Sequence, residues 1–425
     1  APGGAAARPR VGELLGAATP AFTVLTSRGL PLHLRPEVVS EVLDGPQLHQ
    51  LPVGDLILRQ EVVSQCPGAA EGCRGFWPGL AGHRAYCSYR NPRINPSVFG
   101  GDSICSVETT GGRKKVGPKQ LLELQRVMRA DIVAAPAEEV AMDAAGSRRS
   151  QRAVTRAADW LKELLDAKAQ DPALAGFDWH VLAGIQGGGS DKLRQKSCAL
   201  SAALPVSGFW IGGLGYQEDL PSRATVLDAV ASALPAALPR FLPLNVGTPV
   251  EVLQAVMLGV DVLELTYPTQ VAAQGTALTF SWEMPPGDEA DEAADAEVLA
   301  ALLPPQSCDG DAPAPAPAPA KPLSVRQLRL KTPECREDFG PISPESPVKQ
   351  YSRAYLYHLL DVRELLGTML LAQHNLHVYS RFFAAIRSHV QQGTLRRFAA
   401  WFVRTQTCES PPELPAGPAP KRRKV

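Results

Sequence analysis

The sequence lacks several features that would place it in a common protein class. It has no run of eighteen apolar residues, so we expect no membrane span. Its eight cysteines contain no C-x-x-C pair, and in a long chain they are expected to be reduced thiols. Cys66, Cys73 and Cys87 with His83 match none of the common zinc spacings, which argues against a metal cluster there.

Net charge is also lacking, because 43 basic residues balance 43 acidic ones. The charges are nevertheless unevenly distributed. Residues 283–311 hold nine acids and no Lys or Arg, whereas residues 321–425 carry an excess of nine positive charges. A basic terminal region can contact phosphates, and a solvated helical surface has the same composition. Charge alone leaves both interpretations open.

Both ends of the chain have the composition of flexible segments. Residues 1–19 begin with small residues and arginines and contain no acid before Glu13, which fits a transit-peptide stump or a disordered end. Residues 408–425 form a Pro-rich basic tail that ends in KRRKV. This ending is typical of a nuclear address and equally of a solvated charge run. We expect a cytoplasmic protein.

Residues 20–282 alternate short apolar runs with helical stretches, which is the pattern of repeated βα units. Thr248 can cap one of the helices, and Pro249 suits its first turn. Such units predict an α/β fold with a TIM-like (β/α)8 barrel, and a doubly wound open sheet is the alternative. Strands are expected at 22–26, 131–135, 180–184, 208–211 and 260–265, and helices at 118–128, 149–167, 191–203, 225–238 and 249–258.

The composition changes after the predicted barrel. Residues 283–323 are first acidic and then an Ala-Pro repeat, which favours extended backbone and predicts a linker or insertion. Residues 324–407 return to helical periodicity and predict a C-terminal helical subdomain. We expect its helices to break near residues 373–375 and at Gly393.

The segment Tyr351–Tyr379 reads YSRAYLYHLLDVRELLGTMLLAQHNLHVY. It resembles the C-terminal part of the queuine tRNA-ribosyltransferase (tRNA-guanine transglycosylase) family, where C-x-C-x-x-C precedes S/T-R-A-Y and an H-N pair follows. In that family three thiolates and the histidine hold zinc in a tetrahedral site. Here the three cysteine positions fall on Ser343, Glu345 and Val348, and His374 is the one retained ligand. The resemblance therefore implies a degenerate zinc site, and we expect the zinc to be lost and no other cofactor to be bound.

Further motifs in family order support the resemblance. Asn245–Glu264 (NVGTPVEVLQAVMLGVDVLE) is similar to the family segment G-x-G-x-P…GVD-x-F-D, for example. Any one such motif is weak, because Gly-rich loops are common at strand ends of α/β barrels. The other segments similar to family motifs are Gly184–Ser197 (GIQGGGSDKLRQKS), Ile211–Glu218 (IGGLGYQE) and Tyr267–Phe280 (YPTQVAAQGTALTF).

The family exchanges guanine at the wobble position of tRNA for a modified base. A carboxylate attacks C1′ of the ribose and forms a covalent intermediate, which needs a nucleophile held at near-attack distance. The nucleophile position falls on Glu264, where catalytic members have Asp, and the base-reading Asp position falls on Ala137. A strand-end glutamate in a purely structural role is the alternative for Glu264. The resemblance thus implies that no residue of this chain is catalytic.

Other family positions are lost or kept in part. The D-S-G-G-F-Q run has no clear counterpart, and only residues 100–103 lie nearby. Two arginines that meet the anticodon loop in catalytic members fall on Gln270 and Ala273, so both phosphate-binding forks are absent. Positions that touch the base in catalytic relatives, or that brace the barrel as structural residues, are retained as Gln186, Gly213 and Leu214.

The sequence keeps the family's scaffold motifs and lacks its catalytic residues, and in this it resembles the eukaryotic accessory-subunit branch of the family. That branch normally retains the zinc cysteines, which are absent here. The implied partners are a catalytic subunit, in a heterodimer, and tRNA, with a peripheral mitochondrial outer-membrane location as a variant. A catalytically competent enzyme that uses Glu264, and a degenerate scaffold without an RNA role, are the alternatives. Apolar positions that could form the partner interface, or pack on the barrel, are Leu359, Leu365, Leu366, Met369, Leu370, Leu376, Phe382, Phe383 and Ile386.

Overall fold

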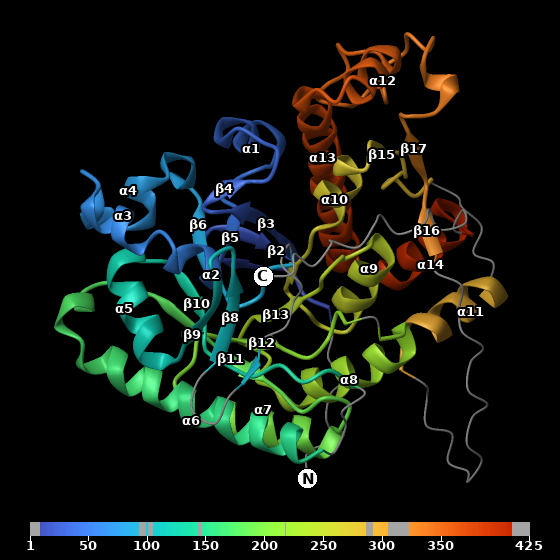
Figure 1. The fold of residues 1–425 in the computed structure, drawn as a ribbon. Helices are drawn as coiled ribbons and strands as arrows, with labels where there is room; N and C mark the ends of the chain where they lie inside the picture. The colour runs from blue at the N-terminus through green and yellow to red at the C-terminus, as the bar shows by residue number, and fades with distance from the viewer. Residues whose placement is uncertain are drawn as a thin grey trace, which may run out of the picture.

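Eight parallel strands close into a barrel in the computed structural model, which describes residues 9–92, 99–100, 105–142, 147–216, 218–285, 292–304 and 323–409 (Figure 1). The strands are β3 (Ala21–Ser27), β5 (Leu48–Pro52), β6 (Arg84–Ser88), β10 (Ile132–Ala134), β11 (His180–Ile185), β12 (Gly208–Ile211), β13 (Arg240–Pro243) and β14 (Val262–Glu264). Closure comes from β14 pairing with β3, where Val262 lies opposite Ala21. The predicted TIM-like barrel is confirmed, and the open sheet is excluded.

Helices surround the barrel, as repeated βα units require. The five expected helices are present as α5 (Pro118–Met128), α6 (Arg148–Gln170), α7 (Asp191–Ala202), α8 (Leu220–Ala233) and α9 (Pro249–Met257). Four lie within three residues of their predicted bounds, and α8 begins and ends five residues earlier than predicted. Further helices are α1 (Pro36–Val42), α2 (Val53–Ile57), α3 (Gln60–Gln65), α4 (Cys73–Phe76), α10 (Tyr267–Ala273) and α11 (Glu292–Leu302). The predicted cap of α9 is confirmed, because Glu251 accepts from the Thr248 N–H at 2.8 Å while the Thr248 hydroxyl accepts from the Glu251 N–H.

Small sheets attach the remaining segments to the barrel. The hairpin of β1 (Gly12–Leu14) and β2 (Ala17–Thr19) lies within the segment that we expected to be flexible. A three-stranded sheet follows β6, made of β7 (Phe99–Gly100), β8 (Cys105–Thr109) and β9 (Gly112–Val116). β15 (Thr276–Leu278) pairs with β17 (Gln327–Arg329), and β16 (Leu323–Val325) pairs with β18 (Thr407–Glu409). The Ala-Pro repeat, residues 101–103 and the KRRKV tail lie outside the described residues.

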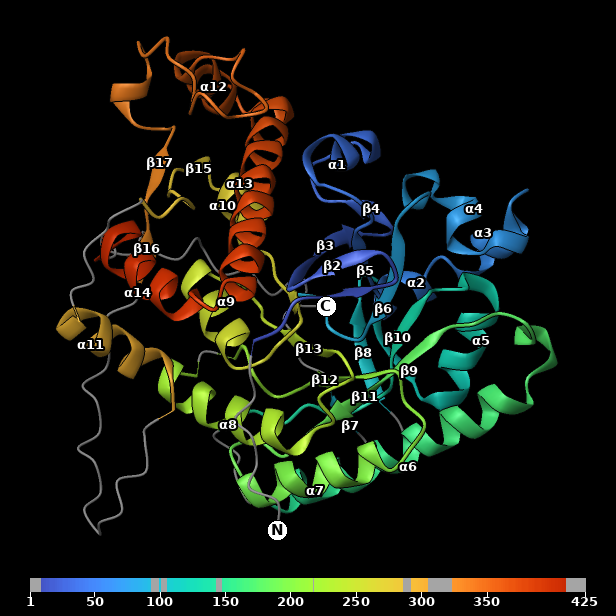
Figure 2. The same cartoon turned by 180° about the vertical axis from the view of Figure 1, so that it is seen from behind.

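The C-terminal helices are α12 (Arg353–Asp361), α13 (Leu365–Gln391) and α14 (Leu395–Gln406), with α13 running beside α10 (Figures 1 and 2). The expected break at Gly393 is confirmed, and its φ of 70° suits glycine. The expected break at residues 373–375 is wrong, because α13 continues through them. His374 and Asn375 are polar residues on the buried face whose side chains bond to Leu278 in β15, so they interrupt the apolar pattern and not the helix.

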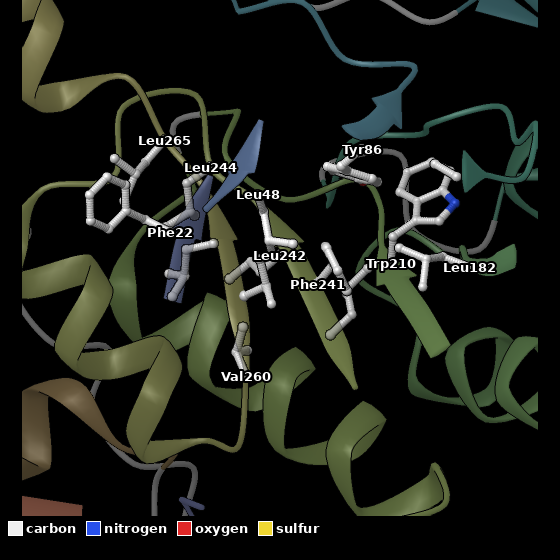
Figure 3. Close-up of a cluster of buried hydrophobic side chains, with 14 of the residues drawn as sticks. Phe22, Leu48, Tyr86, Leu182, Trp210, Phe241, Leu242, Leu244, Val260 and Leu265 are labelled. Atoms are coloured by element: carbon white, nitrogen blue, oxygen red, sulfur yellow. The ribbon is translucent and has the colours of Figure 1, made fainter. Parts of the chain in front are cut away.

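The hydrophobic core extends from the barrel interior to α13. Tyr86, Trp210 and Phe241 belong to the interior cluster (Figure 3). On the outside, the rings of Phe22 and Phe383 have centroids 5.0 Å apart. Most of the apolar positions suggested for a partner interface are therefore buried within this chain. Of those positions, Leu365 and Leu366 are exposed.

Asn375 connects α13 to α10 and β15 through three hydrogen bonds. Its amide oxygen accepts from the Leu278 N–H at 2.9 Å, and its amide nitrogen donates to the carbonyls of Pro268 and Thr276. We predict that Asn375→Ala lowers the free energy of unfolding by about 2–4 kcal/mol, because it leaves buried backbone groups unpaired. Urea unfolding measures the change. Gln391→Ala, on the exposed end of the same helix, is the control, and equal effects of the two changes would contradict the prediction.

Candidate functional site

Glu264 ends β14 inside the barrel and is 2% exposed. Its carboxylate accepts three hydrogen bonds, from the Tyr86 hydroxyl at 2.7 Å, the Ser88 hydroxyl at 2.7 Å and the Gln50 amide at 2.6 Å. The Thr23 hydroxyl donates to the Gln50 amide oxygen, which turns the amide nitrogen towards Glu264. The carboxylate is thus held by neighbouring strands on the inner face of the barrel.

Burial raises the pKa of Glu264 from 4.5 to about 7, although the hydrogen bonds from Tyr86 and Ser88 and the charge of Arg90 act in the opposite direction. A carboxyl with such a pKa is partly protonated at neutral pH. A nucleophilic carboxylate must be ionised and must reach its substrate. Glu264 thus places a carboxyl group at the end of β14, where the family has its nucleophile, but the group is buried and its oxygens are engaged in hydrogen bonds.

Arg90 crosses the carboxyl-terminal end of the barrel, which we call the barrel mouth. Its guanidinium forms a buried ion pair with Glu139, in which each side chain is 2% exposed. It also donates to the carbonyl of Pro243 at 2.7 Å and to that of Leu214 at 2.8 Å. The ring of Tyr216 lies 4.7 Å from the guanidinium carbon. One side chain therefore connects the loops that follow β6, β10, β12 and β13.

The same contacts occupy two of the retained base-contact positions. The N–H of Gly213 donates to the Glu139 carboxylate at 2.8 Å, and the carbonyl of Leu214 accepts from Arg90. Gly213 has a φ of 78°, and a Cβ there would come within 2.4 Å of the Val140 carbonyl oxygen, so the close approach of these loops requires glycine. Backbone groups that could bind a base are instead satisfied by side chains of this chain.

The base-reading position, Ala137, is buried beside the backbone of Gly184. A Cβ on Gly184 would lie 2.8 Å from the Cβ of Ala137 and 2.9 Å from Trp210, which shows how tightly the three residues pack. The Trp210 indole donates to the Ala135 carbonyl at 3.2 Å, and its place in the interior is visible in Figure 3. A buried methyl group offers no carboxylate to the edge of a guanine.

Gln186 is a retained position with an unpaired side-chain amide. Its side chain is fully buried, and neither amide atom has a hydrogen-bond partner among the described residues. A Cβ on Gly212 would lie 2.3 Å from its amide nitrogen, so the amide rests against that backbone. A buried unpaired amide is costly and often marks a binding site. Gln186 is therefore the clearest remnant of a pocket.

The two positions of the lost anticodon-loop arginines lie on the surface of α10. Gln270 and Ala273 are both exposed, and Gln270 accepts a long hydrogen bond of 3.4 Å from the Thr266 hydroxyl. Neither side chain carries a charge. This surface consequently offers no fork for bidentate binding of a phosphate.

The region of the predicted degenerate zinc site is closed by hydrogen bonds. Both ring nitrogens of His374 are engaged, Nδ1 with the Ser346 hydroxyl and Nε2 with the Leu278 carbonyl, each at 2.9 Å. Of the three former cysteine positions, Val348 is buried in an apolar cluster, Glu345 is exposed and Ser343 is partly exposed. Within the described ranges no group of three or more His, Cys, Asp or Glu could hold a metal. These residues do not fit a tetrahedral zinc ion.

Several residues of the site were not singled out in the sequence. Tyr86, Ser88 and Arg90 are two residues apart, which places their side chains on one face of an extended segment. That spacing was a usable signal. Glu139 and Trp210 gave none, because their importance depends on contacts with residues far away in the chain.

The barrel, its carboxyl group at the last strand and its glycine-rich mouth define a family. A family model described as queuine tRNA-ribosyltransferase matches residues 95–407. The chain belongs to this family, and the resemblance seen in the sequence is confirmed.

The relatives include eukaryotic and bacterial proteins. A Xenopus laevis protein named queuine tRNA-ribosyltransferase accessory subunit 2 is 28% identical over 396 residues, which cover 89% of this chain and 91% of the relative. The Homo sapiens protein of the same name is 27% identical over 388 residues, with 88% and 90% covered. The queuine tRNA-ribosyltransferase of Zymomonas mobilis is 26% identical over 412 residues, with 90% and 88% covered. In the part of the chain that the structure describes, no helix is long and apolar enough to cross a membrane.

The raised pKa of Glu264 predicts a pH-dependent stability. The folded state holds this proton more tightly than the unfolded state, so the stabilisation is full below about pH 4.5 and is lost as the pH rises through about 7. Glu264→Gln does not titrate there. Its melting temperature relative to the parent chain is therefore expected to increase from pH 5 to pH 8. Thermal unfolding at both pH values measures this, and a constant difference would show that the carboxyl titrates normally.

Proposed function

We propose that this chain is a non-catalytic accessory subunit that pairs with a catalytic queuine tRNA-ribosyltransferase subunit. The pair would exchange guanine for queuine at the wobble position of tRNA. A cytoplasmic location is part of this proposal, with peripheral association at the mitochondrial outer membrane as a variant. The names of the eukaryotic relatives support the accessory role.

The observation that carries the proposal is the barrel mouth filled by Arg90 and Glu139. A base needs free donors and acceptors at its edge, and here Gly213 and Leu214 give theirs to these two side chains. Removing either ion-pair partner would leave a buried charge unpaired, so the arrangement resists opening. A pocket closed in this way supports a role in forming the complex with the catalytic subunit and not in the base-exchange reaction itself.

A catalytically competent enzyme with Glu264 as nucleophile is the second candidate. The unpaired amide of Gln186 favours it, since this amide could bind a base if the mouth opened. The raised pKa of Glu264 speaks against it, because it keeps the carboxyl partly protonated at neutral pH. The three hydrogen bonds also speak against it, because they engage the carboxyl oxygens.

A partner surface is available at the start of α13. Leu365 and Leu366 are 62% and 39% exposed, and the neighbouring Val362 is 51% exposed. Apolar side chains exposed together are typical of a protein contact. We propose this end of α13 as part of the contact with the catalytic subunit.

We predict that the chain alone forms no covalent intermediate with tRNA, whereas adding it to a catalytic subunit raises base exchange. The intermediate is measured on denaturing gels and exchange by release of labelled guanine. Leu365→Asp places a charge on the exposed end of α13 and is expected to reduce the increase. Glu264→Gln keeps the shape of the side chain and is expected to change exchange by the complex by less than about twofold.

The Glu264→Gln result separates the two candidates. Loss of exchange by about a hundredfold, with the heterodimer intact, would make Glu264 a catalytic carboxylate and refute the accessory role. Base exchange by the parent chain alone would also refute the accessory role.

We also propose that the chain carries no structural zinc. His374 uses both ring nitrogens for hydrogen bonds, and burial lowers its pKa from 6.5 to about 4, which keeps the ring neutral without a metal. Elemental analysis of the purified chain is predicted to give far less than one zinc per chain. One zinc per chain would contradict this and would point to Cys335, Glu345 and His374 as a rebuilt site.

A further inference from the structure

A basic groove lies between two helices that follow neighbouring barrel strands. α6 follows β10 and α7 follows β11, so both helices begin at the carboxyl-terminal face of the barrel, and they lie side by side in both views (Figures 1 and 2). The space between them, which we call the α6–α7 groove, has a volume of about 1120 Å³. Its cations are Arg148, Arg152 and Arg156 on α6 and Lys192 and Lys196 on α7, and Asp159 is an acid in its lining.

Among the residues that the structure describes, one of these cations has an ion-pair partner. Arg156 forms an ion pair with Glu138 at 2.8 Å. Arg148, Arg152, Lys192 and Lys196 are exposed, and no ion pair is recorded for them within the described residues. Their spacing of four residues puts cations about 6 Å apart along each wall. The groove is thus a double row of positive charges.

The placement of arginines on α6 is unfavourable for the helix itself. The amino-terminal end of a helix favours acidic side chains because of the helix dipole. The first turn of α6 has no acid and begins with Arg148 and Arg149. The turn is capped within the chain, because the Ser147 hydroxyl accepts from the Ser150 N–H at 3.1 Å, and Arg149 is paired with Glu138. Arg148 and Arg152 form no ion pair within the described residues, so a bound anion would offset their charge.

The groove has a fixed position relative to the barrel mouth. Arg149 and Arg156 both bind Glu138, which follows Ala137 directly. On the other wall, Ser190 lines the groove four residues after Gln186. A ligand that lies along the groove would therefore pass close to the mouth.

The chemistry of the lining selects an extended polyanion. The described residues that line the groove include no aromatic side chain, so they offer no platform on which bases could stack. Exposed lysines and arginines at regular spacing contact phosphates without reading sequence. We propose that the α6–α7 groove binds the phosphate backbone of RNA, an inference that rests on the proposed role in tRNA base exchange.

The test compares two double variants of the full-length chain. Lys192→Glu/Lys196→Glu changes the groove, and Lys119→Glu/Lys162→Glu makes the same change of charge at exposed positions of α5 and α6 outside it. Acidic residues suit the first turns of α7, so the groove variant should melt no lower than the parent. Binding of an unmodified tRNA transcript with guanine at the wobble position is measured across a salt series, for the chain alone and in complex with a catalytic subunit.

The groove variant is expected to bind the transcript about tenfold more weakly at low salt. Its slope of log affinity against log salt should be smaller by about 1.5, since two phosphate contacts are lost. The control should match the parent. If both variants bind the transcript as well as the parent does, the groove proposal is wrong and the proposed function still stands. The same follows if both variants lose binding equally.

Other outcomes identify a different ligand or a deeper error. If the groove variant loses binding to phosphatidylserine vesicles but not to the transcript, the groove binds a membrane surface and the RNA proposal is wrong. If the parent neither binds the transcript nor raises exchange, the proposed function fails, and the groove proposal fails with it.

Discussion

The buried ion pair of Arg90 and Glu139 is the interaction on which the rest of the barrel mouth depends. Loops after four strands meet at this pair, and none of them makes the closure alone. Removing one partner of an ion pair in a protein interior destabilises the folded protein by about 3–5 kcal/mol. The pair therefore fixes the mouth in one arrangement. Because it also binds the groups of Gly213 and Leu214, the same interaction that holds the loops together removes the donors and acceptors of the pocket.

Sequence patterns predicted those elements whose cause is local. α9 has its capping residues next to each other in the chain, and the apolar runs of β11 and β12 mark buried strands. β5, β6 and β13 were not predicted, because polar or charged residues interrupt their short apolar runs. Gln50 and Ser88 do so because they point inward and bind Glu264. The site was predictable only at Glu264 and at the retained pocket positions, since Arg90 finds its partner 49 residues away.

The region that corresponds to the family zinc site is held by hydrogen bonds and apolar contacts within the chain. A zinc ion would connect a loop to a helix through four strong ligand bonds. Here Ser346 and Leu278 bond to one histidine, while Val348 and Cys335 add to an apolar cluster around α12 and α13. Burial of apolar groups is less directional than coordination and needs more residues for the same effect. The loop before α12 is accordingly held by many weak contacts spread over its length.

α13 has a mechanical consequence for the whole chain. It is a continuous helix of 27 residues, so it is about 40 Å long. Its first turn exposes Leu365 and Leu366, its middle bonds to β15 and α10 through Asn375, and its last turns reach back to the carbonyl of Pro20 through Arg387. α12 also packs against its start, so α13 is supported along its whole length. The exposed leucines therefore have a fixed position relative to the barrel.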